Sequence, residues 1–304
     1  MTYRSFRFGV VAAQAHSGEA WTRKARRVEE LGYATLLMPD RLLGPLLSPL
    51  PALAAAAAAT TSIRLGTFVL AAGWRNPVLL ARECATLDFL SDGRFELGLG
   101  AGVGGEDAVR AGFPQEQPGA RVDRLAETLS IVGAILGGQE ENESDLPYTG
   151  TSSQGYPPPV QKPRPPILVA AGGKRSLALA GREADIVALG VRPDQGEAIL
   201  AEKIGWLRHE AGERFTQLEL NLNLVAVIGE GHPERRTRER LQALFGLDLD
   251  ELVHGGSPFV VSGTTEEMCE QLLGLRERLG VSYITVADEL MDTFAPVVER
   301  LAGI

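Results

Sequence analysis

The chain is poor in the residues that build metal centres and disulfide frameworks. Its 304 residues include only two cysteines and four histidines. Cys84 and Cys269 lie in helical patterns among apolar neighbours, so we expect both thiols to be reduced and buried. The sequence contains no CxxC pair, no HExxH, no GxSxG and no histidine and acidic residues at metal-ligand spacing. A metalloenzyme and a hydrolase are therefore disfavoured.

Long apolar runs and an excess of positive charge are also missing. No run approaches the ~18 apolar residues of a membrane span, and Ala52–Ala59 is predicted to be a packed helix. The first residues, MTYRSFRFG, lack the apolar region of a signal peptide. Lysine and arginine total 30 against 39 acidic residues, a net charge of −9. We expect a soluble, cytoplasmic protein whose main partner is neither nucleic acid nor membrane, with a local anion site still open.

Strands and helices alternate along the chain, and 44% apolar residues can fill a large core. The clearest unit is strand Ile63–Leu70, a helix that starts at Asn76-Pro77, and strand Phe95–Leu99. Two apolar strands joined by a helix form a parallel βαβ unit. Eight strands predict an α/β fold, a single (β/α)8 TIM barrel over residues 1–304, rather than an open sheet. The other six strands are Phe6–Ala13, Ala34–Met38, Ile167–Ala171, Asp185–Leu189, Leu218–Val227 and Ser282–Val286.

Helical periodicity fills the intervals between the predicted strands. Thr264 and Glu267 have the spacing of a capping box for a helix that reaches Leu279. Two segments with little periodicity, Gly137–Pro166 and Gly246–Ser262, are expected to be excursions, the first over the barrel mouth, and to set substrate specificity. The remaining expected helices are Glu19–Leu31, Pro49–Thr60, Val122–Leu136, Ser176–Gly181, Asp194–Ala211, Pro233–Phe245 and Met291–Leu301.

A cluster of glycines follows strand Phe95–Leu99. Because glycine costs conformational entropy, a cluster indicates close backbone approach or positive φ. Ligands of parallel sheets bind at the carboxyl ends of the strands, so we favour a wall for a flat ring system. A dinucleotide fingerprint is disfavoured because no acidic ribose partner lies about twenty residues further on. A purely structural loop is the alternative. The cluster consists of Gly98, Gly100, Gly102, Gly104 and Gly105.

A second glycine pair, Gly172-Gly173, follows strand Ile167–Ala171 and leads through Lys174-Arg175 into a helix. Backbone N–H groups and the helix dipole at such a start suit a phosphate, and late loops of a barrel often provide this site. The alternative is a plain helix start with two exposed basic side chains.

Polar and aromatic residues end several other strands. Asp40 and Arg41 follow strand Ala34–Met38, where an internal ion pair and a ligand contact are both open. His16, on the first loop, is either an exposed histidine or a proton donor. Trp74 is expected to wall a pocket, and Arg75 to pair internally.

Glu106 and Asp107 come directly after the glycine loop. A carboxylate there either donates a proton or caps the next helix. Since no nucleophile or metal site stands out, the sequence indicates chemistry carried by a bound cofactor.

The run LGTFVL…RNPVLLARECATLDFLSDGRFELGLGAG resembles the bacterial luciferase-like monooxygenase superfamily, and more narrowly its branch that depends on the deazaflavin coenzyme F420. The runs EELGYATLLMPDR, RVDRLAETLSIV, VQKPRPPILVAAGGKRSLALAGREADIV and SGTTEEMCEQLLGLRERLGVSYITV extend the resemblance over nearly the whole chain, in order. Other branches of the superfamily bind FMN in the same place.

The resemblance implies a barrel that holds the ring system at the carboxyl ends of its strands. It also implies a non-proline cis peptide between Phe68 and Val69, which makes a bulge behind the ring. The ring-contacting loop maps to residues 100–104, and the phosphate-binding glycines map to 172 and 173. The implied cofactor-binding residues are Asp40, Phe68, Val69, Ala71, Gly100, Ala101, Gly102, Gly172, Gly173, Lys174, Leu189 and Gly190.

The sequence departs from the family pattern at two positions. Members commonly have Asp-His where this chain has Asp40-Arg41, and the sugar-phosphate dehydrogenases have a glutamate where Val103 stands. Both departures argue against alcohol oxidation by the sugar-phosphate dehydrogenase route. We hypothesise that Arg41 stabilises a deazaflavin anion or binds substrate.

The expected function is hydride transfer between coenzyme F420 and a small organic substrate, with reduction of a C=C or C=N bond. The candidate catalytic residues are His16, Arg41, Glu106 and Asp107. One alternative is an FMN-dependent monooxygenase that uses reduced flavin and O2, and a second is a non-catalytic cofactor-binding protein. The resemblance also implies a homodimer formed through barrel helices.

Overall fold

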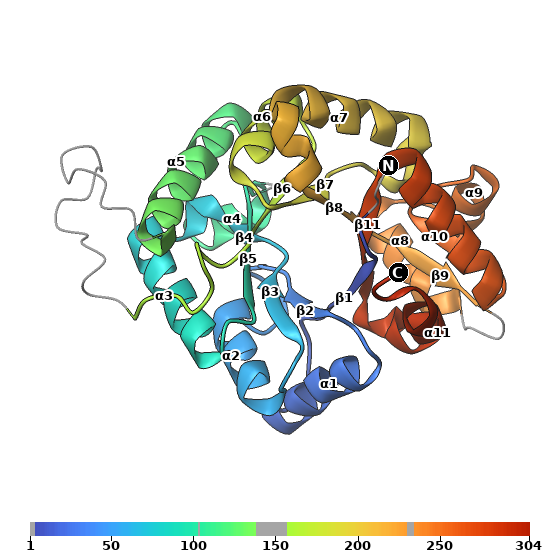
Figure 1. Ribbon diagram of the computed structural model, residues 1–304, viewed down its shortest axis with the longest axis horizontal. Helices are drawn as coiled ribbons and strands as arrows, with labels where there is room; N and C mark the ends of the chain where they lie inside the picture. Colours follow the sequence, from blue (N-terminus) through green and yellow to red (C-terminus); the bar gives the residue numbers. More distant parts are fainter. Residues whose placement is uncertain (1–3, 103, 138–156, 230–233) are drawn as a thin grey trace.

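The centre of the protein is a closed barrel of parallel strands with helices around it (Figure 1). The computed structural model describes residues 4–102, 104–137, 157–229 and 234–304. β3 (Arg64–Thr67) and β4 (Leu70–Ala71) share one of eight positions, and both pair with β5 (Phe95–Gly100). The predicted (β/α)8 barrel is confirmed. The other barrel strands are β1 (Arg7–Val11), β2 (Thr35–Met38), β6 (Ile167–Ala171), β7 (Ile186–Leu189), β8 (Glu219–Asn223) and β11 (Val281–Ala287).

The surrounding helices begin at the capping signals in the sequence. Asn76 accepts hydrogen bonds from the backbone N–H groups of Val78 and Leu79, and Thr264 and Glu267 form the predicted capping box. The helices of the ring are α1 (Gly18–Glu30), α2 (Pro49–Ala59), α3 (Pro77–Leu90), α5 (Pro118–Gly137), α6 (Lys174–Glu183), α7 (Gly196–Ala211), α8 (Glu234–Phe245), α10 (Thr265–Leu279) and α11 (Met291–Leu301). Short 3₁₀ turns are η1 (Ala72–Trp74), η3 (Pro193–Gln195), η4 (Gly212–Gln217) and η5 (Asp288–Leu290).

The structure differs from several of the predicted elements. The expected strand Ile63–Leu70 divides into β3 and β4. The expected strand Leu218–Val227 divides into β8 and β9 (Ala226–Ile228), because its backbone changes partner. The N–H of Leu224 donates to the carbonyl of Thr285 at 2.8 Å, whereas that of Val225 donates to Phe259. β9 then pairs with β10 (Val260–Ser262) outside the barrel. The second excursion thus contains β10 and α9 (Leu249–His254), and residues 138–156 of the first lie outside the described residues.

A short helix, α4 (Glu106–Arg110), follows the glycine loop after β5 and was not expected. Cys84 and Cys269 are buried and free of disulfides, as predicted. Among the described residues, no helix is both long and apolar enough to cross a membrane.

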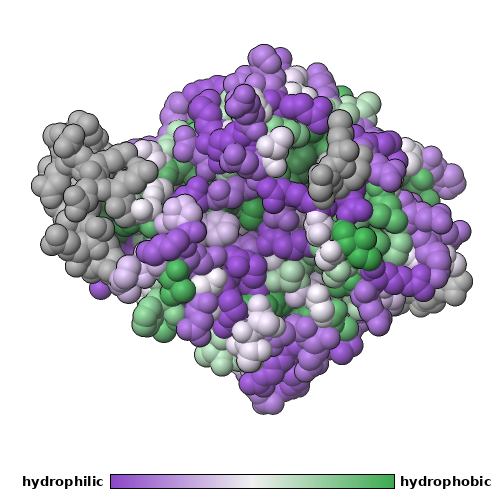
Figure 2. Space-filling model, viewed as in Figure 1, coloured by the Kyte–Doolittle hydropathy of each residue, from purple (hydrophilic) through white to green (hydrophobic). Residues whose placement is uncertain are grey.

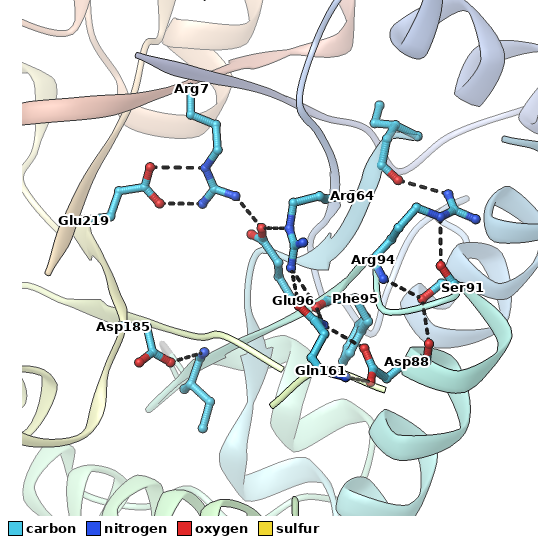
Figure 3. Close-up of polar contacts among 12 residues, drawn as sticks. Arg7, Arg64, Asp88, Ser91, Arg94, Phe95, Glu96, Gln161, Asp185 and Glu219 are labelled. Atoms are coloured by element: carbon cyan, nitrogen blue, oxygen red, sulfur yellow. Dashed lines mark hydrogen bonds and ion pairs between the residues drawn. The ribbon is translucent and has the colours of Figure 1, made fainter. Parts of the chain in front are cut away.

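Charged side chains fill the barrel where its strands begin. Glu96 is 1% exposed and accepts hydrogen bonds from the guanidinium groups of both Arg7 and Arg64 (Figure 3). Arg7 also binds Glu219, with an Nη2–Oε2 distance of 2.6 Å, and its guanidinium lies 3.9 Å from the ring centroid of Tyr283. Hydrophilic residues lie over the centre of the molecule in this view (Figure 2). The cluster of Arg7, Arg64, Glu96 and Glu219 lies at the end of the barrel where the strands begin. Because this end of a TIM barrel serves stability, we assign the cluster a structural role.

Candidate functional site

The backbone of β3 and β4 bulges at the mouth of the barrel, where the strands end. The peptide bond between Phe68 and Val69 is cis, as the resemblance implied. The hydroxyl of Thr67 accepts from the N–H of Gly98 and donates to its carbonyl, both at 2.8 Å. A Cβ at position 100 would lie 2.8 Å from Val69 Cγ2. Glycines at positions 98 and 100 therefore allow close backbone approach, which is one of the two predicted reasons for the cluster.

The remaining glycines of the cluster meet the other predicted reason. Gly102, Gly104 and Gly105 have φ values of 74°, 61° and 128°. Residues with a Cβ rarely adopt such angles, so the loop needs glycine at these positions. Val103 lies outside the described residues.

The inner surface of the mouth is apolar and partly open. Val11, Phe68, Val69 and Ala170 are half-buried and pack on the apolar cluster inside the barrel. Small residues lie side by side at the strand ends, because Gly100 of β5 pairs with Ala170 of β6 and Gly172 follows β6. These partly exposed apolar side chains form an apolar floor, and we expect such a floor to suit the face of a flat ring.

The predicted phosphate site lies at the start of α6. A Cβ at Gly172 would lie 2.3 Å from the carbonyl oxygen of Gly190, so the ends of β6 and β7 touch there. Ser176 Oγ accepts from the N–H groups of Gly172 (3.3 Å) and Gly173 (3.1 Å). The loop amides are thus already bonded to Ser176, which leaves the first-turn N–H groups of Lys174 and Arg175 for an anion, and the phosphate site stays a prediction.

Three cationic side chains surround this helix start. Lys174 Nζ lies 4.8 Å from the ring centroid of Trp206, and Arg175 pairs with Asp123 at 2.5 Å. Lys203 Nζ donates to the carbonyl of Gly190 at 2.8 Å. Lys203 had no sequence signal, because it comes from the middle of α7 and reaches the loop only in the folded chain.

Asp40 forms an ion pair inside the mouth. Its side chain is 4% exposed, binds Arg75 through both oxygens, and accepts from the N–H of Ala71 at 3.2 Å. The prediction that Arg75 pairs internally is confirmed. Asp40 therefore fixes the backbone that follows the bulge, and a direct ligand contact by Asp40 stays a prediction.

The candidate catalytic residues lie on different loops. His16 is exposed and lines an open depression of about 470 Å³ beside α1, together with Arg27 and Met291. Arg41 is also exposed, after β2. Glu106 and Asp107 begin α4, and their side chains lie outside the described residues. Their catalytic roles remain predictions.

A cavity of about 230 Å³ lies beside the glycine loop. Trp74 lines it, as predicted, and its ring lies 5.9 Å from that of Phe113, with an angle of 33° between the planes. Arg121 and Arg124 of α5 reach the cavity, as does Glu116. Sequence reasoning missed Phe113 and Arg121. The run RVDRLAETLSIV predicted the helix that is α5, but helical periodicity did not show that the Arg121 side chain points toward the glycine loop.

Comparison with known proteins identifies the family. The model of the family described as "Luciferase-like monooxygenase" matches residues 5–259. The chain belongs to this family. One relative of this chain, from Microbacterium testaceum, is named F420-dependent glucose-6-phosphate dehydrogenase. It is 30% identical over 249 residues, which cover 79% of this chain and 73% of the relative.

Solved structures of luciferase-like proteins have the same fold. The coenzyme F420 dependent tetrahydromethanopterin reductase of Methanopyrus kandleri superposes with a TM-score of 0.72 at 16% identity, covering 99% of this chain and 100% of the other. A riboflavin lyase with modified FMN gives 0.76 at 17% identity, covering 98% and 93%. At such identities the likeness shows the fold alone.

Proposed function

We propose that this luciferase-like protein is an F420-dependent oxidoreductase that transfers hydride between coenzyme F420 and a small organic substrate with a C=C or C=N bond. The observation that carries the proposal is the shape of the mouth, an apolar floor at Val69 and Ala170 beside a loop without Cβ atoms at 100 and 102. A flat tricyclic ring fits such a surface. The relative from Microbacterium testaceum supports F420 as the cofactor.

The residues present at the mouth fit a cofactor of this kind. Val69, Ala170 and the Gly100–Gly102 backbone would hold the ring, and Gly172 with Lys174 would hold a phosphate. When bound, coenzyme F420 supplies a hydride donor or acceptor at carbon 5 of its ring. The protein contributes orientation and electrostatics, which account for much of the rate in such reactions.

Groups of the protein would position the ring and supply protons or charge beside it. Asp40 and Arg75 fix the backbone at Ala71, which follows the bulge, so the apolar floor is held rigidly. His16, Arg41, Glu106 and Asp107 are proposed as proton donors or charge stabilisers, each requiring hydrogen-bond reach to substrate directly or through water.

The test is a fluorescence titration of the purified protein with coenzyme F420 and, separately, with FMN. We expect tight binding of F420 and weak binding of FMN. Tight FMN binding without F420 binding would overturn the proposal and favour the FMN-dependent monooxygenase. Binding of neither cofactor would contradict both readings.

We also propose a homodimer. Leu79, Phe89 and Leu90 of α3 are 58%, 56% and 55% exposed, and exposed large apolar side chains on one helix are typical of an interaction surface. Sedimentation velocity should give twice the mass of one chain, and a monomer at all concentrations would contradict the proposal.

A further inference from the structure

We propose that the cavity beside Trp74 and Phe113 binds a small planar acid, an aromatic carboxylate, and that its acid group is recognised by Arg121. This inference rests on the proposed function, since it names the substrate class of the same mouth. Ala71, Ala101 and Gly102 line the cavity and also belong to the predicted cofactor site, so a molecule bound here lies next to the ring.

The size of the cavity limits its occupant. A volume of about 230 Å³ exceeds the roughly 150 Å³ of an apolar cavity that takes up benzene. It is smaller than the clefts of about 300 Å³ and more that hold drug-sized ligands. One ring with a short substituent therefore fits this cavity.

The wall of the cavity is aromatic. The Trp74 and Phe113 ring centroids are 5.9 Å apart, which leaves no space for a third ring between them. Both rings line the cavity, together with Ala71 and Ala108. Such a surface favours a planar ring through offset or edge contacts.

The described part of the lining carries a net positive charge. Among the described lining residues, Arg121 and Arg124 carry +2 and Glu116 carries −1, a sum of +1. Arg124 binds the Glu116 carboxylate, with an Nε–Oε2 distance of 3.2 Å. Within the described part of the chain, no carboxylate lies within ion-pair distance of Arg121. The charge of its guanidinium is only partly offset by the nearby Glu116 carboxylate, so it remains available to a ligand.

Arg121 is held in place by backbone groups. Its Nε donates to the carbonyl of Gly102 at 3.1 Å, and its Nη1 donates to that of Glu116 at 2.7 Å. A Cβ at Gly104 would lie 3.0 Å from Nη1, so the guanidinium packs on the glycine loop. These carbonyl contacts orient the planar group without neutralising it, and a guanidinium is well suited to a carboxylate.

The test uses the purified protein without cofactor and measures calorimetric binding of benzoate and of benzyl alcohol, its neutral counterpart. We expect benzoate to bind with a millimolar or lower Kd and benzyl alcohol at least about tenfold more weakly. Because no cofactor is present, the two proposals are tested separately. Absence of benzoate binding would contradict only the substrate proposal, and absence of F420 binding in the titration would contradict only the proposed cofactor.

Two variants locate the site. Arg121→Gln should weaken benzoate binding about tenfold or more and leave benzyl alcohol unchanged, whereas Arg182→Gln, at an exposed arginine of α6, should change neither. Phe113→Leu should weaken both ligands, and Phe215→Leu, at a ring that contacts Arg208 on the surface, should weaken neither. Since Arg121→Gln also removes two backbone contacts, Arg121→Lys is measured in parallel and should retain part of the benzoate affinity.

Several results would overturn the proposal. These are no benzoate binding at about 10 mM, equal affinity for benzyl alcohol, or full benzoate affinity in both Arg121→Gln and Phe113→Leu. Thermal unfolding of each variant identifies any loss that comes from misfolding, and Phe113→Leu decides the proposal if neither Arg121 variant folds.

Discussion

A Cβ atom at position 98 would lie 1.8 Å from the carbonyl oxygen of Thr67. Because backbone cannot move aside as a flexible side chain does, Gly98→Ala should lower the free energy of unfolding by about 3 kcal/mol or more. Gly133→Ala is the matched control, since nothing lies within 4 Å of a Cβ there. Alanine in the interior of α5 should stabilise by about 0.5–1 kcal/mol. Urea unfolding of both variants measures this contrast, and equal stabilities would contradict it.

Asp40→Asn should destabilise the protein by about 2–4 kcal/mol, because it leaves the partly buried Arg75 without its charged partner. Asp123→Asn provides the control. Asp123 also pairs with an arginine, but the pair is 67% and 63% exposed, so its loss should cost less than about 1 kcal/mol. Thermal unfolding compares the two variants. The interpretation is wrong if Asp40→Asn lowers the stability no more than Asp123→Asn does.

Glu29 should make the stability depend on pH in the acid range. Burial alone would raise the pKa of Glu29, but hydrogen bonds from the backbone of Ser62, Ile63 and Thr61 outweigh burial and lower the pKa to about 2. The unfolded pKa is about 4.3. The stabilisation is therefore complete above about pH 4.3 and is lost as the pH falls toward 2.

Glu29→Gln should accordingly cost about 2 kcal/mol at pH 7 and much less at pH 2. Glu30→Gln, at an exposed neighbour on the same helix, should have little effect at either pH. Urea unfolding at both pH values measures the differences. A Glu29→Gln penalty that is the same at pH 2 and pH 7 would show that the charge is not responsible.

The two thiols should be inert in the folded protein. Cys84 is 0% and Cys269 is 8% exposed, and burial raises the pKa of both thiols. Since the thiolate is the reactive form, an aromatic disulfide reagent should label neither cysteine on a timescale of minutes, and both after denaturation. Rapid labelling of one thiol in the native protein would contradict this prediction, and Cys269→Ser would show which thiol reacts.

Local patterns predicted most of the fold because its determinants are short-range. Asn76 and Thr264 start helices through hydrogen bonds to residues two or three positions away, so a few neighbouring residues are enough to predict where these helices begin. The eightfold alternation of strands and helices then favours a barrel. The division of Leu218–Val227 was not predictable, because it depends on which distant strand each N–H meets.

The site was predictable only in part for the same physical reason. The glycine cluster indicated close approach and positive φ, and the structure shows both. The pairing of Asp40 with Arg75 spans 35 positions, and it was expected only as one of two readings. The direction of the Arg121 side chain depends on how α5 packs beside the loop, which no local pattern encodes.

The cluster of Arg7, Arg64, Glu96 and Glu219 has an evolutionary consequence. It joins strands from four positions of the barrel at the end opposite the mouth. The barrel is therefore closed by interactions in which no loop of the mouth takes part. Sequence drift in those loops can change which molecules are accepted while the scaffold persists, and this division explains how one architecture accommodates many chemistries.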